Sequence, residues 1–293
     1  MRELITKQRA KQINAAVEIH TQTPQEALAL GYTTKSLAVA NLPYKDIKKD
    51  RWTRKNGNYT FTVVALREGG KIPFGVIPRL FFIWLITEIT RTRSREIILG
   101  NHFNDFLEKL TYKEDGGYTR KRVTEQLERL FSVAIGTYYD SDGLKQGIPP
   151  ETFIDKFWLW DTKKHTEQQN LFPSKVIVKE KFYNEVIKSP VPIDMRVVEA
   201  FKNSAFKLDV YIWLTYRMFN VREPVRIKYI DLMPQFGNDY DPDNAEALKD
   251  FRKKLRGAIK DVLGCYKANV DTTSPKYIAL YASPTSVPTI AGK

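Results

Sequence analysis

An apolar tripeptide that occurs twice constrains the fold of this chain most. Ile83-Trp84-Leu85 returns as Ile212-Trp213-Leu214, each time inside an apolar stretch of helical character. A tripeptide alone would be a coincidence, but the elements predicted after each copy also come in the same order. A repeat with a fixed order of elements is an architectural signal. The sequence therefore predicts two related modules, each built around one buried apolar helix.

The first module opens at Pro78, which suits the first turn of a helix because it has no amide hydrogen to leave unpaired. A short helix and a longer charged helix follow the apolar one, with a glycine-containing turn between them, which is typical of a helix-turn-helix. A β-hairpin after such a pair is the order of a winged helix, and we expect 152–160 to return beside 132–139. The predicted elements are an apolar helix to Ile89, a strand at 97–99, helices at 101–110 and 118–131, and strands at 132–139, 152–160 and 175–182.

The second module repeats this order. Ser204 caps its apolar helix, which runs to Phe219. Asp241-Pro242 then places a capping side chain before a first-turn proline, which favours the start of a charged helix that ends near Leu263. The other predicted elements are a helix from its cap Asp194 to Phe201, a strand at 225–227, a short helix at 229–236, and strands at 267–270 and 277–281.

With 293 residues, the chain is long enough for two domains that each bury a core. The two prolines of Ser189-Pro190-Val191-Pro192 stiffen a short linker, which predicts a domain boundary there. We predict an α+β protein with two tandem winged-helix domains and an N-terminal arm. Its parts are a basic arm or extension over 1–55, a first winged-helix domain over 56–188, a second over 189–285 and a tail over 286–293.

Lysine and arginine outnumber aspartate and glutamate by 47 to 34, which gives a net charge of +13. Such a charge favours a polyanionic partner, and nucleic acid is the commonest soluble one. A basic protein with no nucleic-acid role is the alternative. Six cations gather between residues 45 and 55, as either a solvated charge run or an extension that contacts phosphates. They are Lys45, Lys48, Lys49, Arg51, Arg54 and Lys55.

The charged helix predicted at 241–263 carries the strongest binding pattern. At about 100° per residue, its large apolar side chains fall on one side and four cations fall on the other. A one-sided stripe of this kind suits a helix in the major groove, because its side chains reach base edges and flanking phosphates. A solvated lysine-rich face is the alternative. The candidate DNA-binding residues are Lys249, Lys253, Arg256 and Lys260.

The corresponding helix of the first module, 118–131, exposes a face of mixed charge. Its candidate DNA-binding residues are Lys121, Arg122, Glu125 and Arg129. A glutamate can accept a hydrogen bond from cytosine N4, but an intrahelical pair between Glu125 and Arg129 is the favoured interpretation. This helix is expected to act as a second reader of DNA or as a dimerisation element.

Catalytic chemistry finds no support in the sequence. The three histidines are too far apart to suggest a metal triad, and Gly69-Gly70-Lys71 lacks the Ser or Thr that follows the lysine of a phosphate loop. The acidic residues Asp239, Asp241 and Asp243 lack the glycine and terminal glutamate of a calcium loop, so capping and turn formation are favoured. We predict that the protein is not an enzyme and has no metal site and no cofactor.

The single cysteine, Cys265, excludes a disulfide within the chain and has the apolar neighbours of a buried side chain. No apolar segment of the signal-peptide type follows the first charges. The longest apolar run, Leu80 to Ile86, is far shorter than the roughly 20 residues that span a bilayer. We expect a cytoplasmic protein that does not enter a membrane.

Several long motifs occur in a fixed order along the chain. They are Leu42-Pro43-Tyr44, the run from Trp52 to Gly57, Pro73 to Arg79, Arg91 to Glu96, Pro190 to Asp194 and Ala205 to Arg217. With them, the sequence from roughly residue 40 to 290 resembles the RepA-type plasmid replication initiators of bacteria. The resemblance implies tandem winged-helix domains, binding to repeated sequences at a plasmid origin, and help in loading the host replication machinery.

The favoured interpretation is a replication initiator whose partners are repeated duplex DNA at a plasmid origin and the host initiator and helicase. A winged-helix transcription regulator, which binds DNA but recruits no replication proteins, is one alternative. A nuclease or primase with diverged motifs is another. The sequence leaves open which DNA sequence is recognised and whether a monomer or a homodimer is active.

Overall fold

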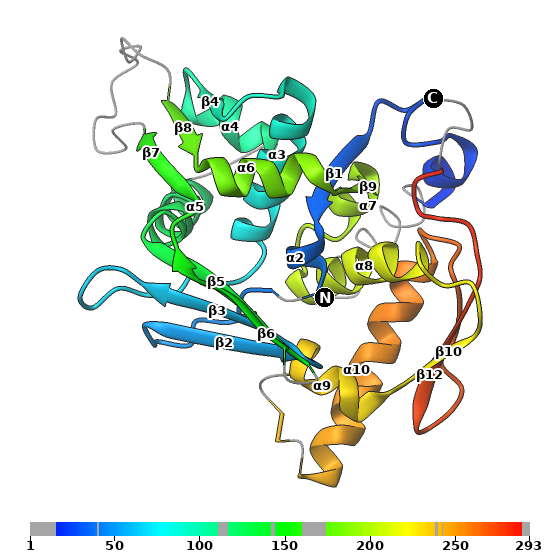
Figure 1. Cartoon of the computed structure of the whole chain (residues 1–293). Coiled ribbons are helices and arrows are strands. Elements are labelled where there is room, and N and C mark those ends of the chain that lie inside the picture. The colour runs from blue at the N-terminus through cyan, green and yellow to red at the C-terminus, as the bar shows by residue number, and fades with distance from the viewer. Residues whose placement is uncertain are drawn as a thin grey trace.

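The computed structural model describes residues 16–39, 41–110, 117–141, 144–159, 174–237, 240–241 and 243–288. Helices and antiparallel strands are interspersed along these ranges (Figure 1). This arrangement confirms a mixed helix and strand fold. No helix in the described ranges combines the length and apolar character that crossing a membrane requires.

Two copies of one arrangement make up much of the described chain. In each copy a buried helix leads to a strand, then to two helices, then to two further strands. The three strands form a sheet in which the first strand pairs with the last, and the last pairs with the middle one. The first copy contains α3 (Ile77–Thr92), β4 (Glu96–Gly100), α4 (Phe103–Lys109), α5 (Gly117–Leu130), β7 (Ile154–Trp158) and β8 (Ser174–Val178). The second contains α8 (Ala205–Met218), β10 (Val225–Lys228), α9 (Tyr229–Phe236), α10 (Ala245–Leu263), β11 (Asn269–Asp271) and β12 (Tyr277–Tyr281).

The two helices that carry the shared tripeptide are the centres of the copies, as predicted. Every residue of α3 from Ile77 to Ile86 is buried, and the predicted proline lies in its first turn. In α8 the run from Leu208 to Thr215 is buried, and the Ser204 side chain caps the helix by accepting from Lys207 N. A helix that is apolar all round has no face for water, so each one must be covered on all sides.

The first copy contains an insertion that the sequence did not predict correctly. β5 (Val133–Ser141) pairs with β6 (Leu144–Glu151), and these strands continue a sheet of order β2-β3-β5-β6 with β2 (Arg51–Asn56) and β3 (Tyr59–Ala65). The predicted pairing of 132–139 with 152–160 is therefore wrong, because β7 pairs with β8 instead. β6 was missed because Pro149 and Pro150 disfavour a strand; they are tolerated here because β6 is at the edge of the sheet.

Two element boundaries also differ from prediction. The strand predicted at 175–182 ends at Val178, and α6 (Glu180–Lys188) starts two residues later. The charged helix begins at Ala245 rather than after Asp241, because the Asn244 side chain caps it by accepting from Glu246 N and Ala247 N. Asp241 accepts from Asp243 N in the preceding turn, and Pro242 lies outside the described residues.

The described part of the predicted arm is built into the fold. Residues 16–21 are helical, and β1 (Leu30–Thr34), α2 (Lys35–Val39) and β2 follow. β1 pairs with β9 (Pro190–Asp194), so the predicted proline linker is a strand that leads into α7 (Met195–Ala200). Near the other end, Val287 is buried and the Pro288 carbonyl accepts from Gln25 Nε2. Residues 1–15 of the arm and 289–293 of the tail lie outside the described residues, and the three boundaries between the four predicted parts stay predictions.

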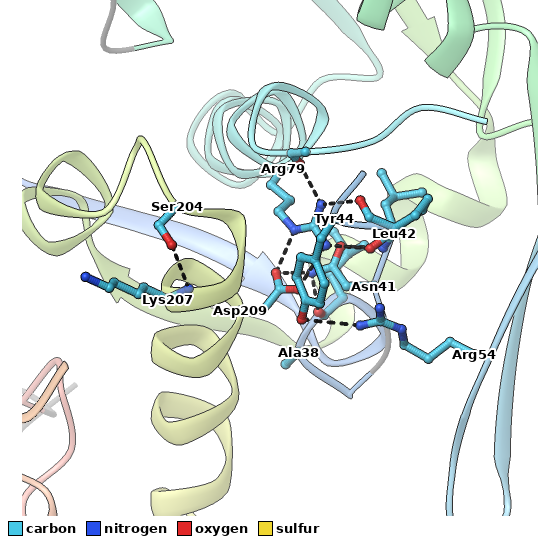
Figure 2. A network of polar contacts seen from close by, with 12 residues as sticks. Ala38, Asn41, Leu42, Tyr44, Arg54, Arg79, Ser204, Lys207 and Asp209 are labelled. Carbon is cyan, nitrogen blue, oxygen red and sulfur yellow. Dashed lines mark hydrogen bonds and ion pairs between the residues drawn. The ribbon is translucent and has the colours of Figure 1, made fainter. Parts of the chain in front are cut away.

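A buried polar network joins the two copies (Figure 2). Arg79 of α3 and Asp209 of α8 form two hydrogen bonds, Nε to Oδ1 at 2.7 Å and a terminal nitrogen to Oδ2 at 2.9 Å. Asn41 donates to the same carboxylate at 2.8 Å. Arg54 of β2 donates to the Gln235 carbonyl in α9. These contacts fix α3 and β2 of the N-terminal half against the second copy.

Candidate nucleic-acid interface

The interface is built on α10, the longest described helix. Its apolar stripe is buried except for Leu248 at the start, which is half-buried, and this confirms the predicted inner side. The buried side chains that anchor it are Phe251, Leu255, Ala258, Ile259 and Val262. They pack α10 against α8 and α9, so its opposite face is held rigidly toward solvent.

The outward face of α10 carries a stripe of five exposed residues at helical spacing. They are Glu246, Lys249, Lys253, Gly257 and Lys260. Lys249 lies beside Glu246 and forms an ion pair with it at 2.8 Å. Lys253 and Lys260 form no ion pair within the described part of the chain, and both are exposed. Gly257 lies between these two lysines, and a Cβ placed there would meet no atom of the described chain within 4 Å. The stripe therefore presents the ammonium groups of Lys253 and Lys260, which are unpaired among the described residues. Between them, at Gly257, no side chain covers the helix backbone.

Arg256 is turned to one side of this stripe. Its Nε donates to the Tyr229 hydroxyl at 3.0 Å, and a terminal nitrogen donates to the carbonyls of Thr273, at 3.1 Å, and Ser274. Arg252, one turn earlier, donates to the Pro275 carbonyl at 2.9 Å. The two arginines thus tether the connection between β11 and β12 to α10. The helical wheel places Arg256 with the lysines, but it gives no sign of this role, because the acceptors are backbone carbonyls from a distant segment.

In the first copy, α5 brings together only some of the predicted residues. Lys121 and Arg122 are exposed, and the Arg122 guanidinium lies 5.5 Å from the centre of the exposed Tyr118 ring. Glu125 pairs with Arg129 at 2.6 Å, which confirms the predicted intrahelical pair. The Arg129 side chain is only 9% exposed, so it is a structural cation rather than part of an open surface.

Arg129 also reaches into the segment before β2. It forms an ion pair with Asp46 at 3.0 Å and donates a hydrogen bond to the Ile72 carbonyl at 3.2 Å. Burial acts to raise the pKa of the Asp46 carboxyl, but the hydrogen bond from Arg129 and a second one from Lys48 N outweigh it and lower the pKa below its usual value. Asp46 is therefore ionised at neutral pH, and it holds the basic segment against α5.

The described residues contain no group of three or more His, Cys, Asp or Glu side chains placed to hold a metal ion. Asp239 of the acidic cluster and His165 lie outside the described residues. Cys265 is buried, as predicted, and burial raises the pKa of its thiol to about 11.

Comparison with protein families gives a match. The sequence profile of the family described as plasmid-encoded RepA protein matches residues 72–229, which is more than half of the chain. The chain belongs to the RepA family. It is accordingly a plasmid replication initiator, as the motifs in its sequence predict. No curated protein sequence matches it significantly.

Two solved structures are similar to this RepA-family chain. A crystal structure of domains 2 and 3 of RctB superposes with a TM-score of 0.51 at 11% identity, over 78% of this chain and 81% of that one. A second structure of RctB domains 2–3 gives 0.48 at 12% identity, over 76% and 82%. At these identities the first likeness concerns the fold alone. The RepA match ends at Tyr229, the first residue of α9, and therefore does not include α10.

Proposed function

We propose that this RepA-family initiator binds repeated duplex DNA at a plasmid origin through two winged-helix modules and recruits the host initiator and helicase there. The modules correspond to residues 56–188 and 189–285. The observation that carries the proposal is the outward stripe of α10. It presents two lysines that have no ion-pair partner among the described residues, on a helix whose opposite side is buried from Phe251 to Val262. No step of this function requires catalysis by the chain.

The order of elements supports the winged-helix assignment. In each copy the helix pair is followed, after the β5–β6 insertion in the first copy, by two strands that pair with each other. The second of these strands also pairs with the strand that precedes the helix pair. In winged helices of this kind the second helix of the pair enters the major groove, which is wide enough for one α-helix. That helix is α5 in the first copy and α10 in the second. The β11–β12 connection, held by Arg252 and Arg256, then lies beside the DNA backbone as the wing.

Binding should depend steeply on salt, because contacts to phosphates release counterions. Each neutralised phosphate is expected to add about 0.9 to the slope of log affinity against log salt concentration. The measurement is fluorescence anisotropy with duplexes from the DNA that adjoins the gene, over a salt series, with a scrambled duplex as control. Equal affinity for both duplexes, or an affinity that does not change with salt, would reject the proposal.

A second assay separates initiation from transcriptional regulation. A plasmid that carries the origin DNA should replicate only in cells that supply this chain in trans. A regulator without a role in replication would bind the DNA but leave the plasmid unreplicated. A hidden nuclease or primase would instead nick supercoiled DNA or make primers when metal and nucleotides are added, and we expect neither product.

Gly257→Ala should separate stability from DNA binding. Glycine in a helix interior costs about 0.5–1 kcal/mol relative to alanine, and no described residue lies within 4 Å of the position that a Cβ at Gly257 would take. The alanine variant should therefore melt at a higher temperature. If the helix backbone lies close to DNA at this point, the same change should weaken DNA binding. Gly257→Leu should lower the affinity by about tenfold or more, and tenfold corresponds to about 1.4 kcal/mol. Unchanged affinity in both variants would show that DNA does not approach α10 here.

A further inference from the structure

The segment from Lys45 to Arg51 lies between the two helices proposed to enter DNA. Four of its side chains are exposed cations: Lys45, Lys48, Lys49 and Arg51. Within the described part of the chain none of the four forms an ion pair. Its two acidic residues are Asp46, which forms an ion pair with Arg129, and the exposed Asp50. The segment is therefore a compact cationic surface.

One end of this segment is fixed to α10. The Tyr44 ring packs edge-on against Phe206 in the first turn of α8, with ring centres 5.5 Å apart. The Lys254 ammonium of α10 lies 4.5 Å from the Phe206 ring centre and 5.8 Å from that of Tyr44. At about 100° per residue, Lys254 and the wing-binding Arg252 flank the outward stripe on opposite sides. The wing and the basic segment thus border the stripe from its two sides.

The other end of the segment is fixed to α5. Asp46 bonds Arg129 at 3.0 Å, and Asp46 also accepts from Lys48 N at 3.0 Å, which closes a turn. Lys48 is one of three described residues other than glycine with a positive φ, at 52°. Such a conformation is uncommon for lysine and needs local support, which the Asp46 carboxylate supplies. The ammonium groups of Lys45, Lys48 and Lys49 are therefore displayed from an ordered turn.

The two fixed ends belong to a single rigid frame. Arg54, three residues beyond the segment, is 1% exposed and donates to Gln235 in α9. Arg79 and Asp209 close the same interface between α3 and α8. A duplex that reaches from α5 to α10 must pass the segment that connects them. Phosphates between the two major-groove contacts would then face its lysines.

We propose that Lys45, Lys48 and Lys49 form a phosphate clamp that holds the stretch of duplex between the sites of α5 and α10. The inference rests on the proposed function and extends it, because it assigns one continuous duplex to both modules. Lysine suits this role as a point charge that contacts phosphate without reading sequence. The clamp therefore contributes affinity and register but no base preference.

The first test is the salt dependence of binding by a triple variant, Lys45→Ala with Lys48→Ala and Lys49→Ala. All three side chains are exposed, so the fold should be retained, which circular dichroism checks. Loss of three phosphate contacts should lower the salt slope by about 2.7, with the ratio of origin to scrambled affinity unchanged. The matched control is Lys188→Ala at the exposed end of α6, which should leave the slope unaltered.

The second test locates the clamp on DNA. Lys48→Cys adds an exposed thiol, whereas Cys265 is 4% exposed and its thiol has a pKa of about 11, so a thiol-directed DNA-cleaving reagent should label position 48 alone. We expect cleavage between the two protected major-groove sites. If the triple variant bound origin DNA as tightly as the wild type with an unchanged salt slope, the clamp would be overturned and the proposed function would stand. Cleavage outside that interval would have the same consequence. A wild-type protein that binds no duplex would overturn both.

Discussion

Replacing Asp209 by alanine should destabilise the folded protein by about 3–5 kcal/mol. The change removes the carboxylate that pairs with Arg79, whose side chain is 1% exposed. The guanidinium would remain buried, and its acceptors among the described residues would be only the carbonyls of Leu42, Pro43 and Gly75. An uncompensated buried charge is far more costly than the loss of an exposed pair, because desolvation is no longer offset by attraction.

Urea unfolding followed by circular dichroism measures this loss. Asp209→Asn keeps the shape of the side chain and should also be strongly destabilising, which separates the effect of charge from that of packing. The control is Glu88→Ala, which breaks a pair with Arg91, whose side chain is 72% exposed; it should cost at most about 1 kcal/mol. Similar losses in the Asp209 and Glu88 variants would show that the buried pair does not hold the two copies together.

Replacing Lys253 and Lys260 together by alanine should weaken binding to origin DNA by about 1–3 kcal/mol for each lysine that reads a base. Both lie on the outward face of α10, where their removal exposes no buried group. The stability of the fold should therefore change little. Anisotropy measurements on origin and scrambled duplexes should show a loss that is larger for the origin sequence.

Neighbouring cations of α10 provide contrasting variants. Lys249→Ala should have a smaller effect, since Lys249 is partly neutralised by Glu246. Arg256→Ala should loosen the wing rather than remove a base contact, because its guanidinium bonds Tyr229 and the carbonyls of the β11–β12 connection. If the double lysine variant bound origin DNA as tightly as the wild type, α10 would not be the reading helix.

The duplication could be predicted because it rests on local patterns. The apolar helices and the apolar side of the last helix are set by residues close together in sequence, and the structure has them where they were expected. Asp115 and Gly116 of the turn predicted before α5 lie outside the described residues. The β6 strand was missed for the opposite reason. Its prolines argue against a strand locally, and only its place at the edge of the sheet makes them acceptable.

The roles of two predicted arginines could not be foreseen from sequence. Arg129 is drawn from the exposed face of α5 by Asp46, 83 residues earlier in the chain. Arg256 is drawn aside by backbone carbonyls, which carry no sequence signature. A helical wheel shows the direction in which a side chain leaves the helix, but the partner that captures its charge depends on tertiary structure.

Methylation protection of guanine N7 on the DNA that adjoins the gene tests the central claim most directly, because N7 lies in the major groove. The account predicts, for the wild type, two protected clusters in each repeat about one helical turn apart. With Lys253 and Lys260 replaced by alanine, the cluster under α10 should lose protection while the other is retained. Protection that is identical in the two proteins, or confined to a single cluster, would contradict the account.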